Sequence, residues 1–502
     1  MPAAFTLTAA DWPQYRGANH DGISSDRINK NWSGGVTNPI WRLPVTNSLS
    51  SFTVSGERAF TQVNRFVANT NKEVCIALSI TNGAELWATP VEDAWYPDGG
   101  VGYDDGPRST PTYDNGSLYI LTSYRKLLKL NATNGVPIWT INLATTYGGT
   151  NIQYQNSASP LIENGLIYVN ANCYSNTILA LSTTNGSLVW RSQNEATTHS
   201  TPVITTIQGV RQVLFATQSG VVSLNPLTGT LLWKFTYPFT YSGHSLAVSP
   251  VVYQDMVFMS GAHTYGYGSV VRRVTFTNNA WSTSLLWWTN NVASHYMTPV
   301  VFDGFIYGQF GYQQTDLNYT TPLKCVDMRT GAVKWSTNNF GHGGVLLANN
   351  NLLLITERGD LVLAQPNTNA YTELARFTAI PEFDPDTNKC WNTPAVANGR
   401  VYVRSTSWGA CFDLSLPNLK LDAPQVTNPA KFQLTVRTID GTAIDPNRLT
   451  TMEIHASASL AQPPAAWPKV TNSLTLSNGV ATVTNIDGSV SPTRFFIISE
   501  PN

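Results

Sequence analysis

The chain has 502 residues, of which 42% are hydrophobic and only 12% are charged, and its formal net charge at pH 7 is −1. This balance gives no electrostatic basis for binding nucleic acid or an anionic membrane surface, and no run is long and apolar enough to span a bilayer. Polarity comes from Asn, Thr, Ser and Gln. Together with abundant Gly, Pro, Trp and Tyr, this composition predicts many short strands joined by tight turns.

The chain begins MPAAFTLTAADWPQYRG, which has neither the basic nor the apolar region of a secretory signal. Low charge with many Asn and Thr residues is typical of secreted or periplasmic bacterial proteins. We therefore expect that location, with a signal peptide that has been removed. The first strand expected along the chain lies in NPIWRLPV, which ends at Val45.

A motif of Thr or Asn, Gly, three further residues and Trp then recurs at intervals of about 45 to 55 residues, the period of a four-stranded propeller blade. Its five copies end at Trp87, Trp139, Trp190, Trp233 and Trp335, and a degenerate copy, TNNAWSTSLLWW, precedes Trp288. The Gly step supplies the positive φ of a tight turn. The alternation after it places Trp on one face of an outer strand, where it can pack on the neighbouring repeat.

A hairpin precedes each of these strands, and most hairpins start with a Ser-Pro or Thr-Pro step, as in STPTYDNGSLYILTS and MTPVVFDGFIYGQF. Eight such units are present, and the last, ending GACFDLS, has no Trp motif of its own. We expect NPIWRLPV to supply its outer strand. The sequence thus predicts an all-β fold with an eight-bladed β-propeller over residues 11–415, closed by an N-terminal strand. An open array or two separate β-domains is the alternative.

The pattern changes after about Pro417. Residues 416–430 are expected to be a linker, and residues 431–502 read as alternating strands that predict a small C-terminal β-sandwich. The five cysteines have no CxxC spacing, which excludes zinc-finger and thioredoxin-type motifs. Cys390 and Cys411 form either one disulfide or two buried thiols.

The [TN]GxxxW and SPxxxxGxxY patterns resemble PQQ-like (quinoprotein-type) propeller repeats, which occur in quinoprotein alcohol dehydrogenases and in the outer-membrane assembly lipoprotein of Gram-negative bacteria. The opening DWPQYRGANHDGIS is similar to the start of secreted PQQ-like propeller proteins. The resemblance covers roughly residues 11–415 and implies a fold more than an activity. The alcohol dehydrogenases carry an adjacent Cys-Cys pair, which this sequence lacks together with any CxxCH haem motif. We therefore expect no PQQ-dependent dehydrogenase.

Four of the seven histidines stand just before inner strands of the predicted ring: His199, His244, His295 and His342. Such segments should project around one mouth of the central channel. The four imidazoles are therefore candidate ligands of a divalent transition metal (Zn, Mn, Fe or Cu) or candidate acid and base groups.

Other polar and aromatic residues fall in equivalent positions. Arg108 is the candidate clamp for a substrate anion, Tyr296 is a second catalytic candidate, and the candidate substrate-binding residues are Trp391, Asn392, Asn156, Asp105, Tyr103 and Trp95. The last three include carboxylate and aromatic side chains of the connection 92–109, which suit either sugar stacking or a Ca²⁺ site. The alternative is that His, Asn and Ser at the mouth simply cap loop amides.

These residues predict a metal-assisted enzyme, a lyase or an oxidoreductase, that acts on a polar small molecule or polysaccharide of carbohydrate type. A hydrolase is disfavoured because no carboxylate pair occupies equivalent mouth positions. Some propeller polysaccharide lyases resemble this arrangement of His, Tyr and Arg, although only in architecture. The competing hypothesis is a non-catalytic protein- or glycan-binding scaffold resembling the assembly lipoprotein. A monomer is expected in either case.

Overall fold

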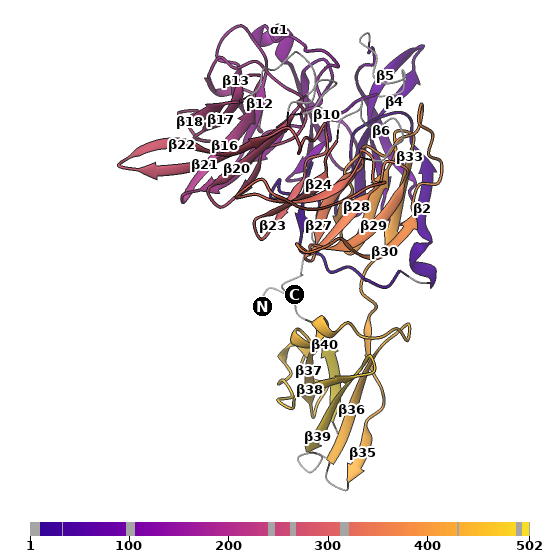
Figure 1. The fold of residues 1–502 in the computed structure, drawn as a ribbon. Helices are drawn as coiled ribbons and strands as arrows, with labels where there is room; N and C mark the ends of the chain where they lie inside the picture. The colour runs from indigo at the N-terminus through magenta and orange to yellow at the C-terminus, as the bar shows by residue number, and fades with distance from the viewer. Residues whose placement is uncertain are drawn as a thin grey trace. The chain divides into compact units, whose positions relative to one another are not determined.

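The computed structural model describes residues 11–32, 34–96, 106–238, 246–261, 268–311, 321–428, 431–487 and 494–500. The described residues are almost entirely β-strand and turn, which confirms the all-β prediction (Figure 1). The chain divides into two compact units, Met1–Leu414 and Ser415–Asn502.

The described strands of the first unit form eight sheets, and within the first four sheets the strands pair in sequence order. The first sheet contains β3 (Thr53–Ser55), β4 (Arg58–Val67), β5 (Thr70–Ser79) and β6 (Glu85–Asp93). The second contains β7 (Thr112–Asp114), β8 (Ser117–Leu121), β9 (Lys126–Asn131) and β10 (Pro137–Asn142), followed by the short helix α1 (Leu143–Tyr147). The third contains β11 (Leu161–Glu163), β12 (Leu166–Asn170), β13 (Ile178–Ser182) and β14 (Leu188–Ser192), and the fourth contains β15 (Val203–Ile207), β16 (Val210–Ala216), β17 (Gly220–Leu224) and β18 (Leu231–Thr236).

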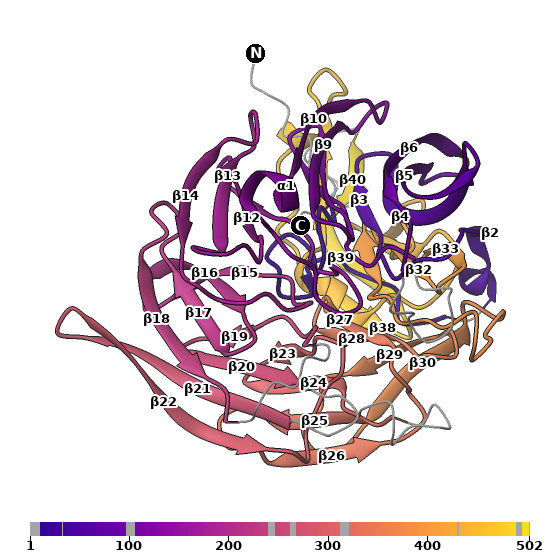
Figure 2. The same cartoon turned by 90° about the horizontal axis from the view of Figure 1, so that it is seen from above.

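The remaining four sheets repeat this plan. The fifth contains β19 (Val251–Tyr253), β20 (Met256–Gly261), β21 (Gly268–Thr277) and β22 (Ala280–Thr289), and the sixth contains β23 (Val300–Phe302), β24 (Phe305–Gln309), β25 (Leu323–Asp327) and β26 (Val333–Thr337). The seventh contains β27 (Gly344–Ala348), β28 (Asn351–Ile355), β29 (Asp360–Gln365) and β30 (Thr372–Thr378), and the eighth contains β31 (Ala395–Ala397), β32 (Arg400–Arg404) and β33 (Trp408–Asp413). The sheets are arranged around a common centre, with their first strands innermost (Figure 2).

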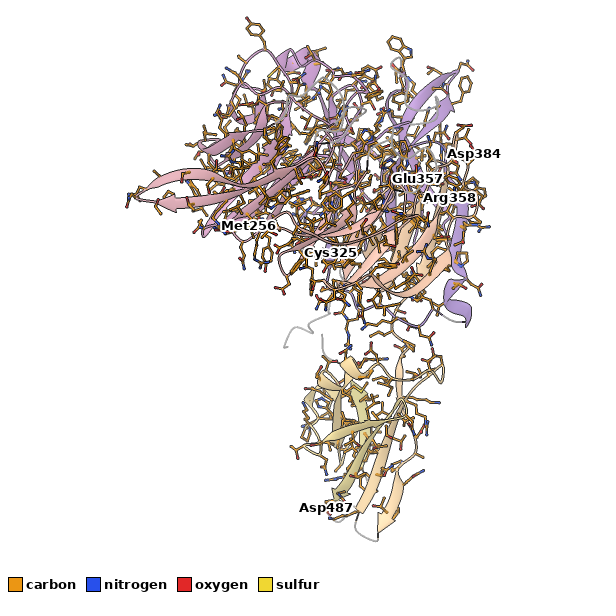
Figure 3. All side chains as sticks on the ribbon, viewed as in Figure 1. Met256, Cys325, Glu357, Arg358, Asp384 and Asp487 are labelled. Carbon is orange, nitrogen blue, oxygen red and sulfur yellow. The ribbon has the colours of Figure 1, made fainter. Side chains whose placement is uncertain are left out.

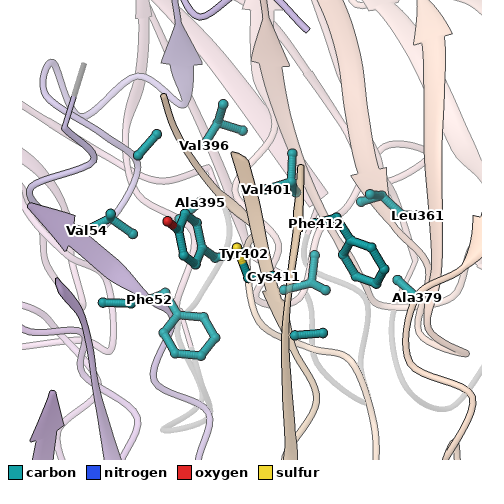
Figure 4. Close-up of a cluster of buried hydrophobic side chains, with 14 of the residues drawn as sticks. Phe52, Val54, Leu361, Ala379, Ala395, Val396, Val401, Tyr402, Cys411 and Phe412 are labelled. Carbon is teal, nitrogen blue, oxygen red and sulfur yellow. The ribbon is translucent and has the colours of Figure 1, made fainter. Parts of the chain in front are cut away.

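The eighth sheet takes its outer strand from the beginning of the chain, as the sequence predicts. Strand β2 (Pro39–Pro44), preceded by the 3-10 helix η1 (Gly34–Thr37), pairs antiparallel with β33. The core beside this seam includes Phe52 and Val54 of the first sheet's beginning, Tyr402 of β32 and Phe412 of β33 (Figure 4). Cys390 and Cys411 are buried free thiols, as are the other three cysteines.

Residues 11–24 cross the inside of the ring. Trp12 pairs with Val54 of the first sheet through two backbone hydrogen bonds of 2.9 Å, and Tyr113 N of the second sheet donates to Pro13 O over 2.7 Å. On the other side, Arg16 Nη1 donates to Thr298 O at the start of the sixth sheet over 2.8 Å. Strand β1 (Ile23–Ser24) then pairs in parallel with β27. This segment therefore links inner strands from opposite sides of the ring.

The repeated Trp side chains connect neighbouring sheets, which confirms their predicted packing. The indole Nε1 of Trp190 in the third sheet donates to Pro226 O in the fourth over 2.9 Å, and that of Trp87 donates to Ala132 O over 3.2 Å. In the degenerate copy, Trp287 makes this contact with Met328 O over 2.8 Å. The sequence motif predicts this contact for Trp288, but Trp288 is 47% exposed.

We expect Gly229→Ala to destabilise the protein by about 2 kcal/mol. Gly229 has a φ of +71°, and a Cβ there would lie 2.5 Å from the Trp190 ring. The substitution combines a left-handed backbone penalty with overpacking. Gly209→Ala is the matched control, because its φ is +76° but nothing lies within 4 Å of the added Cβ. Urea unfolding should give the larger loss at Gly229, and equal losses would contradict the role assigned to the tryptophan.

The Ser/Thr-Pro steps form a chain of hydrogen bonds between neighbouring sheets. Ser51 N donates to Thr110 Oγ1 over 3.0 Å, and Thr110 N donates to Ser159 Oγ over 2.9 Å. Ser159 N donates in turn to Thr201 Oγ1 over 3.0 Å. Each hydroxyl thus satisfies a buried amide of the preceding sheet, which explains why the step recurs.

The same pairing joins Ser249 N to Thr298 Oγ1 over 3.0 Å. Thr298→Val keeps the side-chain shape but leaves this buried amide without its acceptor, so we expect a loss of about 1–2 kcal/mol in unfolding free energy. Thr298→Ser retains the hydroxyl and is the control. If the two variants unfold at the same urea concentration, the hydroxyl does not stabilise the ring.

The second unit has its own core, which includes Leu434, Val436, Ile454 and Val483. Its strands are β34 (Leu419–Leu421), β35 (Gln425–Asn428), β36 (Lys431–Thr438), β37 (Glu453–Ser457), β38 (Leu474–Ser477), β39 (Val480–Asp487) and β40 (Phe495–Ser499), with 3-10 helices η3 (Pro446–Thr450) and η4 (Pro464–Ala466). Strands β34, β35, β36, β38 and β39 form one sheet, and β37 and β40 form another. The sequence placed a linker at 416–430, but β34 and β35 pair with β36 and belong to this unit.

Candidate functional site

Two of the four predicted histidines lie together in an aromatic cluster that we define as His295, Tyr296, His342 and Trp391. The rings of His295 and Tyr296 are stacked with centroids 4.0 Å apart, and the centroids of His295 and His342 are 6.2 Å apart. Tyr296 lies 4.8 Å from Trp391. These residues come from the segments just before β23, β27 and β31, which are equivalent positions of three consecutive repeats.

A buried carboxylate fixes two members of the aromatic cluster. Trp391 Nε1 donates to Glu357 Oε1 over 2.6 Å, and His342 N donates to Glu357 Oε2 over 2.9 Å. Glu357 lies in the turn between β28 and β29, beside Arg358 (Figure 3). Lys389 Nζ lies 4.6 Å from the centroid of the Trp391 ring, a cation–π contact. Sequence reasoning missed Glu357 and Lys389.

His199 has a different environment. Its Nε2 lies 2.8 Å from Gln153 O, and since a carbonyl only accepts, this nitrogen carries the proton. Its ring centroid is 6.4 Å from that of Tyr154. Burial, reinforced by the charge of Arg108, lowers the pKa of His199 to about 4. The imidazole is therefore neutral at pH 7 and is held by the segment that follows α1.

The four-histidine metal site stays a prediction. His244 lies outside the described residues, as do Tyr103 and Asp105. Within the described ranges, no three His, Cys, Asp or Glu side chains are grouped so that they could hold a metal ion. The residues that the structure describes therefore give the metal hypothesis no support.

Three other predicted site residues bind loop carbonyls. Arg108 Nη1 donates to Tyr154 O over 2.7 Å, Asn156 Nδ2 to Ala158 O over 3.0 Å, and Asn392 Nδ2 to Ser50 O over 2.9 Å. These contacts match the alternative in which mouth side chains cap the loop backbone. Trp95 is 67% exposed.

A buried acidic site near Arg108 was not predicted. Glu73 of β5 is fully buried, accepts a hydrogen bond from Tyr96 OH over 2.8 Å, and accepts another from Ser123 N over 3.2 Å. Burial raises the pKa of Glu73 to about 7. Arg108 lies over the Tyr96 ring, 5.9 Å from its centroid. A carboxylate within the apolar strand NKEVCIALS is unusual enough to have signalled this site.

The four-stranded sheets lie around a common centre, and the repeated Trp of one sheet contacts the turn of the next, as Trp190 does at Pro226. These features define a β-propeller of PQQ-like repeats. A family model described as outer membrane protein assembly factor BamB matches residues 70–337. This is more than half of the 502 residues, and the chain belongs to that family.

The outer membrane protein assembly factor BamB of Moranella endobia (strain PCIT) is 24% identical to this chain over 279 residues, which cover 52% of this chain and 65% of that relative. The match thus spans just under two thirds of the relative's length. BamB from Moraxella catarrhalis aligns with a TM-score of 0.50 and 14% identity, over 75% of this chain and 97% of that one. A quinohemoprotein alcohol dehydrogenase from Comamonas testosteroni aligns with a TM-score of 0.57 and 12% identity, over 89% and 85%. At these identities, the solved structures share the fold alone.

Proposed function

We propose that this protein is a non-catalytic scaffold of the bacterial envelope that binds protein partners. The observation that carries the proposal is its membership of a family described as an outer membrane assembly factor. The environment of the mouth residues supports it, because Arg108, Asn156 and Asn392 each donate a hydrogen bond to a loop carbonyl.

The same proposal assigns a periplasmic location, since the relative is named for the outer membrane. In the described ranges, no helix is long and apolar enough to cross a membrane. We further propose that the eight sheets are the blades of one closed, eight-bladed propeller, that residues 415–502 form a small β-sandwich, and that the protein is a monomer.

Partner binding is tested with the purified full chain and the purified outer-membrane assembly proteins of the same organism. A saturable complex, measured by analytical ultracentrifugation and competed by unlabelled chain, supports the proposal. A His295→Ala/His342→Ala variant that binds with unchanged affinity would separate this function from the aromatic cluster. Absence of any complex with these proteins contradicts the scaffold.

The second candidate is a metal-assisted lyase or oxidoreductase acting on a carbohydrate-like substrate. It is favoured by the ring contacts among His295, Tyr296, His342 and Trp391 and by the hydrogen bond from Trp391 to Glu357. Metal analysis of the purified chain should then give stoichiometric Zn, Mn, Fe or Cu, which the same double variant loses. Uronic-acid polysaccharides should also give new ultraviolet absorbance. A metal-free chain without turnover contradicts this candidate, and it leaves the scaffold proposal standing.

A further inference from the structure

Three arginines are among the largest fully buried side chains: Arg16, Arg125 and Arg404. Two of them direct their guanidinium groups at oxygen atoms. Arg16 donates to the carbonyls of residues 20, 21, 298 and 299, and Arg404 donates to four carbonyls and one hydroxyl. Buried cations are satisfied in this way because an unpaired donor carries a large desolvation cost.

Arg125 departs from this pattern. It lies in the turn between β8 and β9 and is 1% exposed. Its Nη1 donates to Asn170 O over 3.0 Å. Among the described residues, neither its Nε nor its Nη2 has a hydrogen-bond partner, although both atoms are buried. Burial lowers the pKa of Arg125 only to about 10, so the side chain is a cation at neutral pH.

The two unsatisfied atoms are the pair that binds planar anions. Nε–H and Nη2–H point to the same side of a guanidinium group and match the two oxygens of a carboxylate. Arg448 uses this pair on Glu500, with distances of 2.9 and 2.5 Å. Arg376 uses it on Glu373, with distances of 3.1 and 2.9 Å. Arg125 presents the same pair without an Asp or Glu among the described residues to receive it.

Arg125 is covered by the start of α1 and lies near His199 and Cys173. Leu143 N, at the start of α1, donates to Arg125 O over 2.9 Å. The charges of Arg108 and Arg125 both lower the pKa of His199, so both guanidinium groups lie near that imidazole, and Cys173 interacts electrostatically with Arg125. Tyr154 and Gln155, which follow α1, have φ values of 63° and 56°, and Arg125 itself has 64°. Left-handed non-glycine residues often cluster at binding sites.

We propose that Arg125 binds a small planar carboxylate-type anion of the size of formate, acetate or bicarbonate through Nε and Nη2, between the second and third sheets. Because Arg125 is 1% exposed, the proposal is confined to anions of this small size. A carboxylate balances the buried charge and satisfies both donors, whereas water satisfies the donors without balancing the charge. This site is independent of the proposed partner-binding function.

The test uses the purified full chain in anion-poor buffer, with sodium formate titrated against sodium chloride at equal ionic strength. Formate at about one hundred times its dissociation constant should raise the melting temperature of the wild type by about 3 °C more than chloride does. Saturation-transfer NMR on ¹³C-formate detects the bound anion directly and requires no variant.

Arg125→Lys keeps a cation but lacks the planar donor pair, so the formate-specific shift and the saturation transfer should both disappear. Cys173→Asp places a carboxylate near Arg125 and should raise the melting temperature without formate while removing the response to it. Arg376→Lys, at a partly exposed guanidinium group that already holds Glu373, is the control and should respond like the wild type. Equal effects of formate and chloride, or an unchanged response in Arg125→Lys, overturn the proposal.

Discussion

Arg404→Met is expected to lower the free energy of unfolding by about 4 kcal/mol. Arg404 Nη1 donates to Thr61 Oγ1 over 2.6 Å and to Gln62 O over 3.1 Å, both in the first sheet. Nε donates to Ser405 O over 3.1 Å within the eighth sheet. Met leaves these buried acceptors unpaired, at about 1–3 kcal/mol each, and the relief of the buried cation offsets part of the loss.

The measurement is urea unfolding followed by tryptophan fluorescence. Arg273→Met removes a partly exposed arginine that pairs with Asp255 over 3.1 Å, and we expect a change below about 1 kcal/mol. A loss at Arg404 no larger than at Arg273 would show that the contacts across this seam are dispensable.

Glu73→Gln is expected to make the protein more stable than the wild type at alkaline pH and to lose that advantage as pH falls. Burial raises the pKa of folded Glu73 from 4.5 to about 7. A group with a raised folded pKa stabilises the fold below its unfolded pKa and loses that contribution as pH rises through the folded value. The window is therefore about pH 4.5 to 7. At about 1.4 kcal/mol per pKa unit, the shift of about 2.5 units gives about 3 kcal/mol.

Unfolding free energies of wild type and Glu73→Gln measured at pH 4 and pH 8 test this expectation. The unfolding free energy of Glu73→Gln minus that of the wild type should be about 3 kcal/mol larger at pH 8 than at pH 4. Glu85→Gln, at an exposed carboxylate of the same sheet, controls for a general effect of lost charge. A constant difference between wild type and Glu73→Gln would show that the buried carboxyl does not titrate in this window.

The repeat made most of the fold predictable from sequence. The Gly-to-Trp spacing predicted both the turn and the contact that Trp190 makes with the next sheet. Because the last unit lacks a Trp-containing strand of its own, the sequence predicts that NPIWRLPV supplies it, and this segment does pair with β33. In the degenerate copy the sequence does not show which of two adjacent tryptophans packs on the next sheet, because neighbouring residues of a strand point to opposite faces. The structure shows that Trp287 contacts Met328 and that Trp288 is exposed.

The candidate site was harder to predict because loops, not repeats, determine where its side chains lie. The repeat alignment places His295 and His342 in equivalent segments but leaves open whether their rings meet, and their centroids lie 6.2 Å apart. His199 is held by Gln153 in the segment after α1, whose path the repeat does not specify. Glu357 was missed because it comes from a turn between later strands of its sheet.

The pairing of β2 with β33 has a consequence for how the protein folds. Pro39 lies opposite Phe412, so the eighth sheet cannot be completed until almost the whole of the first unit has been synthesised. Contacts this distant in sequence are slow to form, since the loop between them must close first. The growing chain therefore carries unpaired strand edges until residue 413 has emerged, and during that interval it is prone to aggregate.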